Sequence, residues 1–442
     1  MDTLAVIEQR QAALQVPHWG LARRVAFRFC FVYFGLFCLF TQVVTALFPI
    51  PITEFPDPST LSPARQIVFW TAAHIFHIRT PLVYTGSGSG DKTFDWVLAF
   101  CLLTVAVVAT TIWSVLDRKR ENYATLHKWF RLAMRFALAG QMLVYGMAKA
   151  VPLQMPFPSL SRLIEHFGDF SPMGVLWASV GASPAYEIFA GCAEIPGGIL
   201  LIFPRTALFG ALICLLDMFQ VFMLNMTYDV PVKLFSFHLM LLSLFLLAPG
   251  FRSLANLFFL HRAAQPAGEP QFFAARRPNG IAFAAQMLFG AWLIGMNMYG
   301  AWEGWLSAYG GGRAKSPLYG IWDVDQFSID GQLQPPLLTD NGRWRRAIFE
   351  IPGRMIFQRM DDSSAVFGAS VKVSDSTLTL IRDKVDKYWK ANFVFQRVAA
   401  NRLILDGDRD GHKTHMELRQ VDRKFRLVGQ SFHWIQEYPI NR

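Results

Sequence analysis

The sequence predicts an α-helical membrane bundle of about seven transmembrane helices, followed by a small C-terminal antiparallel β-barrel or β-sandwich. Of the 442 residues, 53% are hydrophobic and only 17% are charged, which is less charge than a soluble protein of this length normally carries. The long apolar runs all lie before residue 303. The chain after residue 313 is polar and divided into short alternating segments, so we expect a membrane part and a soluble part.

Seven apolar runs are long enough to be transmembrane helices, since about 20 helical residues cross the roughly 30 Å hydrocarbon core of a membrane. The predicted spans are residues 29–48, 96–115, 132–149, 188–203, 207–225, 232–247 and 281–302. Residues 1–24 precede them as a polar, amphipathic segment, in which we expect no cleaved signal peptide. In the fourth span, the sequence Pro196-Gly197-Gly198 is expected to interrupt the helix.

The distribution of Lys and Arg predicts the orientation of these spans. With the N-terminus in the cytoplasm, the inner segments before residue 303 carry fourteen Lys and Arg residues and the outer loops carry four. Cytoplasmic loops are the ones enriched in these residues. An odd number of spans then places the C-terminal domain outside the cytoplasm. We therefore expect a multi-pass protein of a bacterial inner membrane with a periplasmic C-terminal domain.

The net charge of +10 comes from basic clusters beside the apolar runs, so it does not indicate nucleic acid as a partner. Both long outer loops contain apolar segments that are too short to cross a membrane. Residues 66–77 in the first loop, and residues 160–167 and 173–180 in the second, are predicted to be interfacial helices on the membrane surface.

The five cysteines all fall in apolar runs, and none forms a C-x-x-C pair. The sequence therefore predicts neither a disulfide-stabilised C-terminal domain nor dithiol redox chemistry within this chain. The cysteines are Cys30, Cys38, Cys101, Cys192 and Cys214.

Two other patterns have the spacing of metal ligands. Asp406-x-Asp408-x-Asp410-Gly411 followed by Glu417 matches a calcium loop in its letters. A calcium loop of this type lies between two helices, whereas the flanking residues alternate as strands do, so a hairpin turn is the better interpretation. His74-x-x-His77 has no evident third ligand. We expect no metal site.

Short alternating runs predict the strands of the C-terminal domain at residues 345–351, 366–371, 377–381, 392–397, 402–405 and 415–421. The sequence Gly320-Ile321-Trp322 at the start of this domain resembles the G-x-W start of lipocalin-like barrels. The resemblance implies a lipocalin-like β-domain.

Charged side chains inside the predicted spans are the strongest functional signal, because each costs about 2.5–3.5 kcal/mol in hydrocarbon. In the third span, Arg135 and Lys149 share a helix face with Gly146, and in the fourth span Glu194 shares a face with Glu187 and several glycines. The glycines allow close helix packing. We therefore expect Arg135 or Lys149 to lie against Glu194, either as a structural ion pair or as part of a functional site.

Further polar residues lie at or near the predicted outer ends of the spans. Snorkelling explains a lysine at such a position, but it does not explain why acids, a tyrosine and an asparagine join it. The pattern predicts a polar pocket in the outer half of the bundle. The residues at this end are Lys149, Glu187, Asn225, Tyr228, Asp229 and Lys233.

Three segments together resemble the core helices of the DoxX family. They are Tyr145-Gly146-x-x-Lys149, Phe189-Ala-Gly-Cys-Ala-Glu194-x-x-Gly197-Gly198 and Asn225-x-x-Tyr228-Asp229-x-Pro231-x-Lys233. The resemblance covers about residues 125–260 and implies a four-helix membrane core. Because some relatives belong to thiosulfate:quinone oxidoreductases, it also implies quinone-linked redox chemistry. The chain departs from the family by three additional spans and the β-domain.

The predicted domain boundaries follow from these patterns. Residues 1–24 form a cytoplasmic amphipathic N-terminus, and residues 25–124 contain the first two spans and an outer loop. Residues 125–260 form the DoxX-like core, residues 261–303 a cytoplasmic linker and the last span, and residues 313–442 the extracytoplasmic β-rich domain.

The function predicted from the sequence is the binding of a quinone or a similar lipid-soluble molecule in an outer-leaflet polar pocket, in a redox role. The chain has no flavin, haem or iron–sulfur signature, so we expect no covalent cofactor and electrons supplied by a partner protein. Glu194 and His238 are the candidate catalytic proton carriers. The candidate ligand-binding residues are Arg135, Lys149, Glu187, Asn225, Tyr228, Asp229 and Lys233. The alternative is a non-enzymatic membrane protein whose outer β-domain binds lipid or a partner protein.

Overall fold

The structure is a computed structural model that describes residues 18–50, 56–263, 271–308, 310–382, 389–430 and 432–439. The chain divides into two compact units. The helical unit comprises Met1–Val151 and Ile188–Trp302, and the barrel unit comprises Pro152–Glu187 and Glu303–Arg442.

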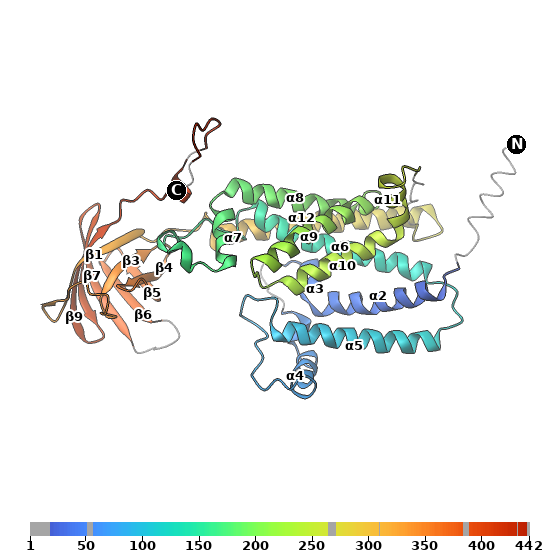
Figure 1. Cartoon of the computed structure of the whole chain (residues 1–442), viewed down its shortest axis with the longest axis horizontal. Helices are drawn as coiled ribbons and strands as arrows, with labels where there is room; N and C mark the ends of the chain where they lie inside the picture. The colour runs from blue at the N-terminus through green and yellow to red at the C-terminus, as the bar shows by residue number, and fades with distance from the viewer. Residues whose placement is uncertain are drawn as a thin grey trace. The chain divides into compact units, whose positions relative to one another are not determined.

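The helical unit is built from long helices that run side by side, with the short α4 crossing them (Figure 1). Its helices are α2 (Leu21–Phe40), α3 (Gln42–Leu47), α4 (Ala64–His74), α5 (Thr93–Leu116), α6 (Ala124–Ala150), α8 (Pro184–Ile202), α9 (Ala207–Thr227), α10 (Lys233–Leu247), α11 (Phe251–Phe258) and α12 (Arg276–Ser307), with 3-10 turns at Pro58–Thr60 and Ala248–Gly250.

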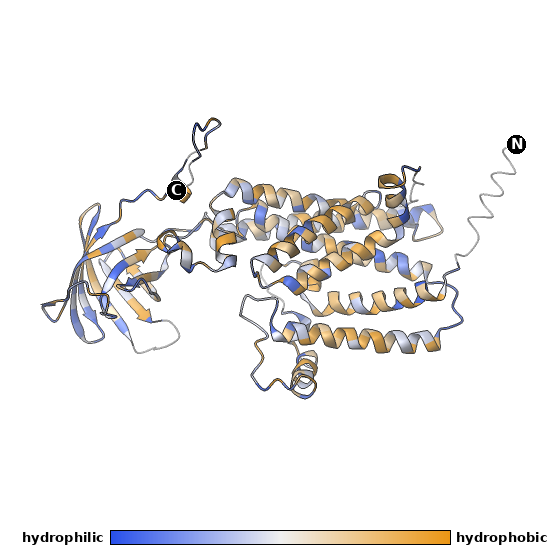
Figure 2. Cartoon of the chain, in the orientation of Figure 1, coloured by the Kyte–Doolittle hydropathy of each residue, from blue (hydrophilic) through white to orange (hydrophobic). Residues whose placement is uncertain are grey.

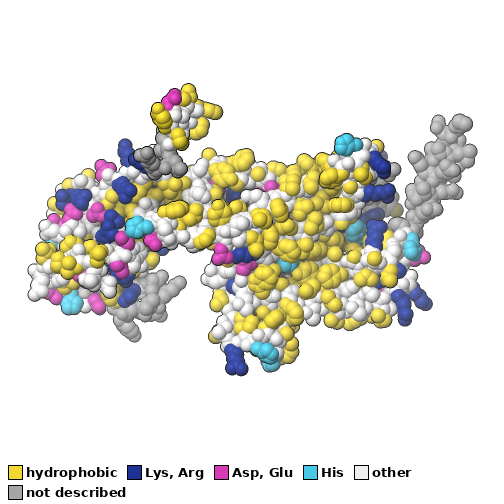
Figure 3. Space-filling model, in the orientation of Figure 1, with side chains coloured by type: hydrophobic (Ala, Val, Ile, Leu, Met, Phe, Trp, Pro, Cys, Tyr) yellow, Lys and Arg dark blue, Asp and Glu magenta, His cyan; other side chains and the backbone are white. Residues whose placement is uncertain are grey.

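Five helices among the described residues are long and apolar enough to cross a membrane, which indicates a membrane protein. They are α5, α8, α9, the α10–α11 segment Lys233–Phe258, and α12. Hydrophobic residues are found all around these helices, and their side chains also cover the visible outer surface of the helical unit (Figures 2 and 3). On α5, for example, Val105, Val107 and Ile112 are about half exposed. Such a continuous exposed apolar surface is suited to lipid.

The other two predicted spans also form helices, although they are more polar. The helix predicted at residues 29–48 begins earlier, at Leu21, and is divided at Thr41 into α2 and α3. Thr41 has extended backbone angles, which no α-helix tolerates. The helix α6 carries Lys128, Arg131, Arg135 and Lys149. The total of seven spans therefore stays a prediction.

The fourth predicted span is a continuous helix, so the expected interruption at Pro196 is wrong: α8 passes through this residue. Membrane helices accept proline where neighbouring groups compensate for the lost backbone hydrogen bond. The glycines of α8 do what the sequence predicts. A Cβ on Gly191 would lie 2.3 Å from Ala150 N and 2.6 Å from Gly146 O, so α6 and α8 touch through their backbones.

The barrel unit contains one antiparallel sheet that closes on itself. In the ring, β3 pairs with β1, each of β4 to β9 pairs with the strand before it, and β9 pairs back onto β1. Eight of the nine strands therefore close a barrel, while β2 pairs antiparallel with the end of β1. The strands are β1 (Gly320–Ile329), β2 (Gln332–Leu333), β3 (Trp344–Phe349), β4 (Gly353–Arg359), β5 (Ser364–Lys372), β6 (Thr377–Arg382), β7 (Lys390–Ala399), β8 (Arg402–Arg409) and β9 (His412–Gln420). The unit also contains α7 (Pro172–Gly181), α13 (Arg426–Gly429) and 3-10 turns at Arg162–Ile164 and Phe167–Asp169.

Large side chains fill the barrel. Along β7, buried and exposed residues alternate, as expected for a strand with one face inside the barrel. Trp322, Trp344, Phe327 and Phe393 are among the fully buried side chains of its core. An eight-stranded barrel has an interior just wide enough to be filled in this way.

Most of the secondary structure in this unit matches the sequence prediction. All six predicted strands are present, whereas β1, β2 and β4 were not predicted. The acidic sequence before Glu417 ends β8 and turns at Asp410 and Gly411, both with positive φ, so the hairpin interpretation is confirmed. Of the two interfacial helices predicted in the second outer loop, the one at residues 173–180 is present as α7. Residues 160–167 contain only 3-10 turns.

Candidate functional site

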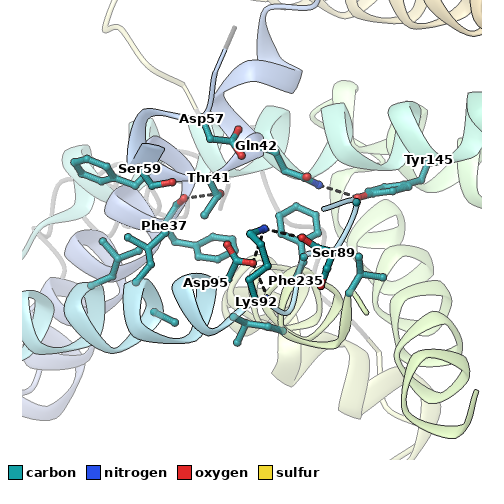
Figure 4. Close-up of a pocket in the computed structure, with 18 residues that line it drawn as sticks. Phe37, Thr41, Gln42, Asp57, Ser59, Ser89, Lys92, Asp95, Tyr145 and Phe235 are labelled. Atoms are coloured by element: carbon teal, nitrogen blue, oxygen red, sulfur yellow. Dashed lines mark hydrogen bonds and ion pairs between the residues drawn. The ribbon is translucent and has the colours of Figure 1, made fainter. Parts of the chain in front are cut away.

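A cavity with a volume of about 380 Å³ lies within the helical unit, where α2, α3, α5, α6 and α10 meet the loop before α5. Figure 4 shows polar and aromatic side chains converging on it from these elements. Its walls include Phe37, Thr41, Gln42, Asp57, Ser59, Ser89, Lys92, Asp95, Tyr145 and Phe235.

A hydrogen bond between α3 and α6 forms one wall of the cavity. Gln42 Nε2 donates to the hydroxyl oxygen of Tyr145 at 2.7 Å (Figure 4). The break at Thr41 makes this possible, because Gln42 is the first residue of the new helix. Since the Tyr145 oxygen accepts from Gln42, its own proton is available to a molecule in the cavity.

Charged residues line another part of the wall. Lys92 Nζ lies 2.8 Å from Asp95 Oδ2 and donates to Ser89 O at 2.6 Å. Asp57 faces the same cavity from the loop after α3. Burial raises the pKa of the Asp57 carboxyl above its usual value, while Lys92 lowers it and Asp95 raises it. Asp57 therefore takes up a proton at a higher pH than an exposed aspartate does.

The buried pair Lys149–Glu194 lies behind Tyr145. Lys149 Nζ is 2.7 Å and 2.8 Å from the two carboxylate oxygens of Glu194, and the two residues are 7% and 6% exposed. The same ammonium group lies 5.9 Å from the centre of the Tyr145 ring. The expectation that Lys149 or Arg135 meets Glu194 is resolved in favour of Lys149. Arg135 instead donates to Leu201 O at 2.9 Å and Ile202 O at 2.8 Å, at the end of α8.

A second carboxylate belongs to this cluster. Asp217 on α9 is close enough to Glu194 and Lys149 for both charges to act on it. Among the described residues, its buried Oδ2 atom has no hydrogen-bond partner. Lys149 is thus ion-paired with Glu194, and Asp217 adds a second carboxylate near that pair.

His238 lies behind another wall of the cavity. Its ring stacks on Phe37 with centroids 4.2 Å apart, and Phe37 lines the cavity. His238 Nδ1 faces Leu234 O at 2.7 Å, so this nitrogen carries the proton. Nε2 then accepts a hydrogen bond from the Tyr33 hydroxyl at 2.7 Å.

Several other predicted residues hold the turn between α9 and α10. Asn225 Nδ2 donates to Ser236 Oγ at 3.0 Å, and Lys233 Nζ lies 2.8 Å from Asp229 Oδ1. Asp91 lies in the loop before α5 and holds that loop against the α9–α10 turn. Its carboxylate accepts hydrogen bonds from Lys233 N at 2.8 Å and Leu234 N at 2.9 Å. These contacts position the part of α10 that lines the cavity.

The two remaining candidates are placed differently. Glu187 Oε1 accepts from Met155 N at 2.8 Å within the barrel unit. Tyr228 follows the last residue of α9, is half-buried, and is not among the residues that line the cavity.

Of the residues predicted from the sequence, Lys149, Glu194 and His238 lie just behind residues that line the cavity. The residues that line the cavity were not predicted as site residues. Tyr145 lies in a segment that resembles the DoxX family, but the sequence alone does not distinguish it as a site residue. Gln42, Asp57 and Lys92 come from residues 25–124, outside that resemblance. Gln42 lies inside the predicted span 29–48, and Asp57 and Lys92 lie in the loop that follows it, so no sequence pattern marked them.

Within the described part of the chain, no group of three or more His, Cys, Asp or Glu side chains is arranged to hold a metal ion. His74 stacks on Trp70, and its Nδ1 lies 2.9 Å from Trp70 O.

The chain is similar to a bacterial protein that is itself uncharacterized. Over 133 residues the chain is 32% identical to the uncharacterized protein YwoB of Bacillus subtilis (strain 168), and the match covers 28% of this chain and 79% of YwoB. No family model matches the chain. No solved structure matches it either.

Proposed function

The chain belongs to the family of YwoB of Bacillus subtilis, and we propose that it binds a quinone or a similar lipid-soluble molecule in the cavity beside Tyr145, in a redox role with a partner protein. The observation that carries this proposal is the hydrogen bond from Gln42 to Tyr145, which leaves the tyrosine hydroxyl free to donate its proton to an occupant of the cavity. Membrane lipid surrounds the helices and supplies such a molecule.

The chemistry of the cavity suits a quinone headgroup. Such a headgroup is a flat apolar ring with carbonyl oxygens that accept hydrogen bonds. Phe37 and Phe235 offer apolar walls, and Tyr145 offers a donor. The volume of about 380 Å³ is in the range of small-molecule sites.

Reduction of a quinone to a quinol needs two electrons and two protons, and the electrons come from the redox partner protein. Asp57 is the proposed proton source at the cavity. Glu194 and His238 are the proposed proton carriers behind it: Glu194 is ion-paired with Lys149 beside Tyr145, and His238 stacks on Phe37, an apolar ring that lines the cavity and passes no proton itself. Lys149 and Glu194 also position Tyr145. In this proposal Arg135, Asn225, Asp229 and Lys233 support the helices that form the site.

The resemblance to the DoxX family is part of this proposal. We propose that α6, α8, α9 and α10 form a DoxX-like four-helix core, and that the barrel is lipocalin-like. The convergence of Lys149, Glu194 and Asp217 from three of these helices supports a common core.

The direct test is a mass-spectrometric inventory of small molecules that co-purify with the full chain. A quinone present near one copy per chain supports the proposal. A sample that carries phospholipid but no quinone, even after incubation with a short-chain quinone, contradicts it.

We further propose a bacterial inner-membrane location with the N-terminus in the cytoplasm and the barrel in the periplasm. Alkaline phosphatase fused after Arg442 should be active, and the same enzyme fused after Arg120 should be inactive. The reverse pattern would overturn the orientation.

A further inference from the structure

The barrel unit contains a second cavity, with a volume of about 600 Å³. It is lined by residues 157–163, by residues that follow α12, and by the segment after β9 that contains α13. No residue of the proposed quinone site lines it.

Positive charge dominates this cavity. Four cationic side chains and one carboxylate, that of Glu350, line it, which gives a formal charge of 4 − 1 = +3. The cations are Arg313, Lys315, Arg423 and Lys424. Glu350 Oε1 accepts a hydrogen bond from Leu160 N at 3.2 Å. Within the described ranges, no ion pair joins any of the four cations to an acid.

Local contacts hold three of these cations in place. Arg313 donates from Nε to Gly310 O at 3.0 Å and from Nη1 to Ala308 O at 3.2 Å. Lys315 Nζ lies 4.6 Å from the centre of the Tyr319 ring, and the Arg423 guanidinium lies 5.4 Å from that of Phe425. Because these contacts already restrict the three side chains, less side-chain entropy is lost when an anion binds to them.

Apolar side chains line the cavity beside the cations. Phe157, Leu160 and Leu163 come from one segment, and Phe425 and Val428 come from another. Phe157 is 49% exposed. A small inorganic anion would use the cations and leave this apolar surface in water, whereas an anionic amphiphile would cover both.

The place of these residues in the chain favours a membrane lipid as that amphiphile. Gly310 to Lys315 follow within eight residues of Ser307, the end of α12, which is long and apolar enough to cross a membrane. Anionic phospholipids attract basic residues that lie near a membrane surface.

We propose that this cavity binds the headgroup of an anionic phospholipid, with the phosphate among Arg313, Lys315, Arg423 and Lys424 and the apolar part of the lipid against residues 157–163 and 425–428. This site is independent of the proposed quinone site. It gives a defined location to lipid binding by the β-domain.

The test measures phosphatidylglycerol bound to the full chain by native mass spectrometry in a neutral detergent. Arg423→Gln/Lys424→Gln removes two of the four charges. Arg354→Gln/Lys372→Gln is the matched control, because these two exposed cations lie on β4 and β5 and do not line the cavity. Lys315→Gln is a second test variant that leaves the segment after β9 unchanged. A thermal unfolding transition like that of wild type confirms folding of each.

We expect the double cavity variant to bind phosphatidylglycerol about tenfold more weakly than wild type, and the control to bind as wild type does. Phosphatidylcholine with the same acyl chains should bind weakly to all of them. Equal binding of phosphatidylglycerol to wild type and both cavity variants would overturn the proposal. Displacement of the lipid by inorganic phosphate at equal concentration would overturn it too, since the cavity would then be a phosphate site. The quinone content of each sample is a separate readout that these substitutions should not change.

Discussion

Lys149 and Glu194 form a buried ion pair in which both carboxylate oxygens lie within 2.8 Å of the ammonium nitrogen. The pair joins α6 to α8 at the point where Gly146 and Gly191 bring the two backbones into contact. It also lies against Tyr145, which lines the cavity. The pair therefore connects helix packing to the proposed ligand site, and substitutions can separate these two roles.

Glu194→Gln should lower both stability and quinone occupancy. It leaves the Lys149 ammonium buried without a counter-charge, which costs about 3–5 kcal/mol in proteins. The double variant Lys149→Met/Glu194→Gln should recover much of the thermal stability, because no lone charge remains, while bound quinone per folded protein stays low. Glu187→Gln, whose carboxylate contacts Met155, is the control and should retain the quinone. Normal quinone occupancy in the double variant would show that the pair only joins helices.

Asp217→Asn should increase stability, in contrast to Glu194→Gln. Both substitutions remove one charge from the same cluster, but the Oδ2 atom of Asp217 has no hydrogen-bond partner in the described structure. The asparagine amide leaves a polar atom at the same position, so the expected gain comes from removal of the charge, which is costly inside a membrane helix. We expect a gain of about 1 kcal/mol, measured as a higher melting temperature in detergent. A loss of stability would mean that Asp217 has a stabilising contact.

Residues 313–442 should fold when expressed alone, because the strands close a barrel around their own aromatic core. The expected result is a soluble fragment with a strand-type circular dichroism spectrum. Addition of calcium should leave its melting temperature unchanged, since the acidic residues near Asp410 form a hairpin turn. An unfolded fragment would contradict the independence of this domain.

The stability of that fragment should fall in acid. A hydrogen bond from His412, and then one from Lys413 N, lowers the pKa of the Asp330 carboxyl below its usual value. A carboxyl whose pKa is lower in the folded state contributes stability above its unfolded pKa of about 4, and this contribution is lost as the pH falls through the folded value. The melting temperature should therefore decrease below about pH 4, and Asp330→Asn should weaken this dependence. Asp375→Asn, at an exposed turn residue, should leave it as in wild type.

The sequence predicted the parts of the fold that follow from periodicity and composition. Strand alternation and apolar runs are local, so six of the strands and the long helices were found, whereas β1, β2 and β4 were not. The continuity of α8 through Pro196 was not, because it depends on neighbouring helices. A cation of α6 against Glu194 could be predicted because charges inside an apolar run need partners, but the choice of Lys149 over Arg135 could not.

The cavity could not be predicted, because its walls combine distant segments. Gln42 reaches Tyr145 only because the helix breaks at Thr41, and no sequence pattern marks that break. Lys92 comes from a loop that Asp91 holds against α10, a tertiary contact between residues about 140 positions apart.

The measurement that tests the central claim most directly is the quinone content of Tyr145→Phe compared with that of wild type. This substitution removes only the hydroxyl that accepts from Gln42 and faces the cavity. Tyr228→Phe is the matched control, since Tyr228 does not line the cavity. We predict that Tyr145→Phe retains the fold and loses about tenfold in quinone affinity, the value of one hydrogen bond of about 1.4 kcal/mol, while Tyr228→Phe binds as wild type does. Equal quinone content in wild type and both variants would contradict the account.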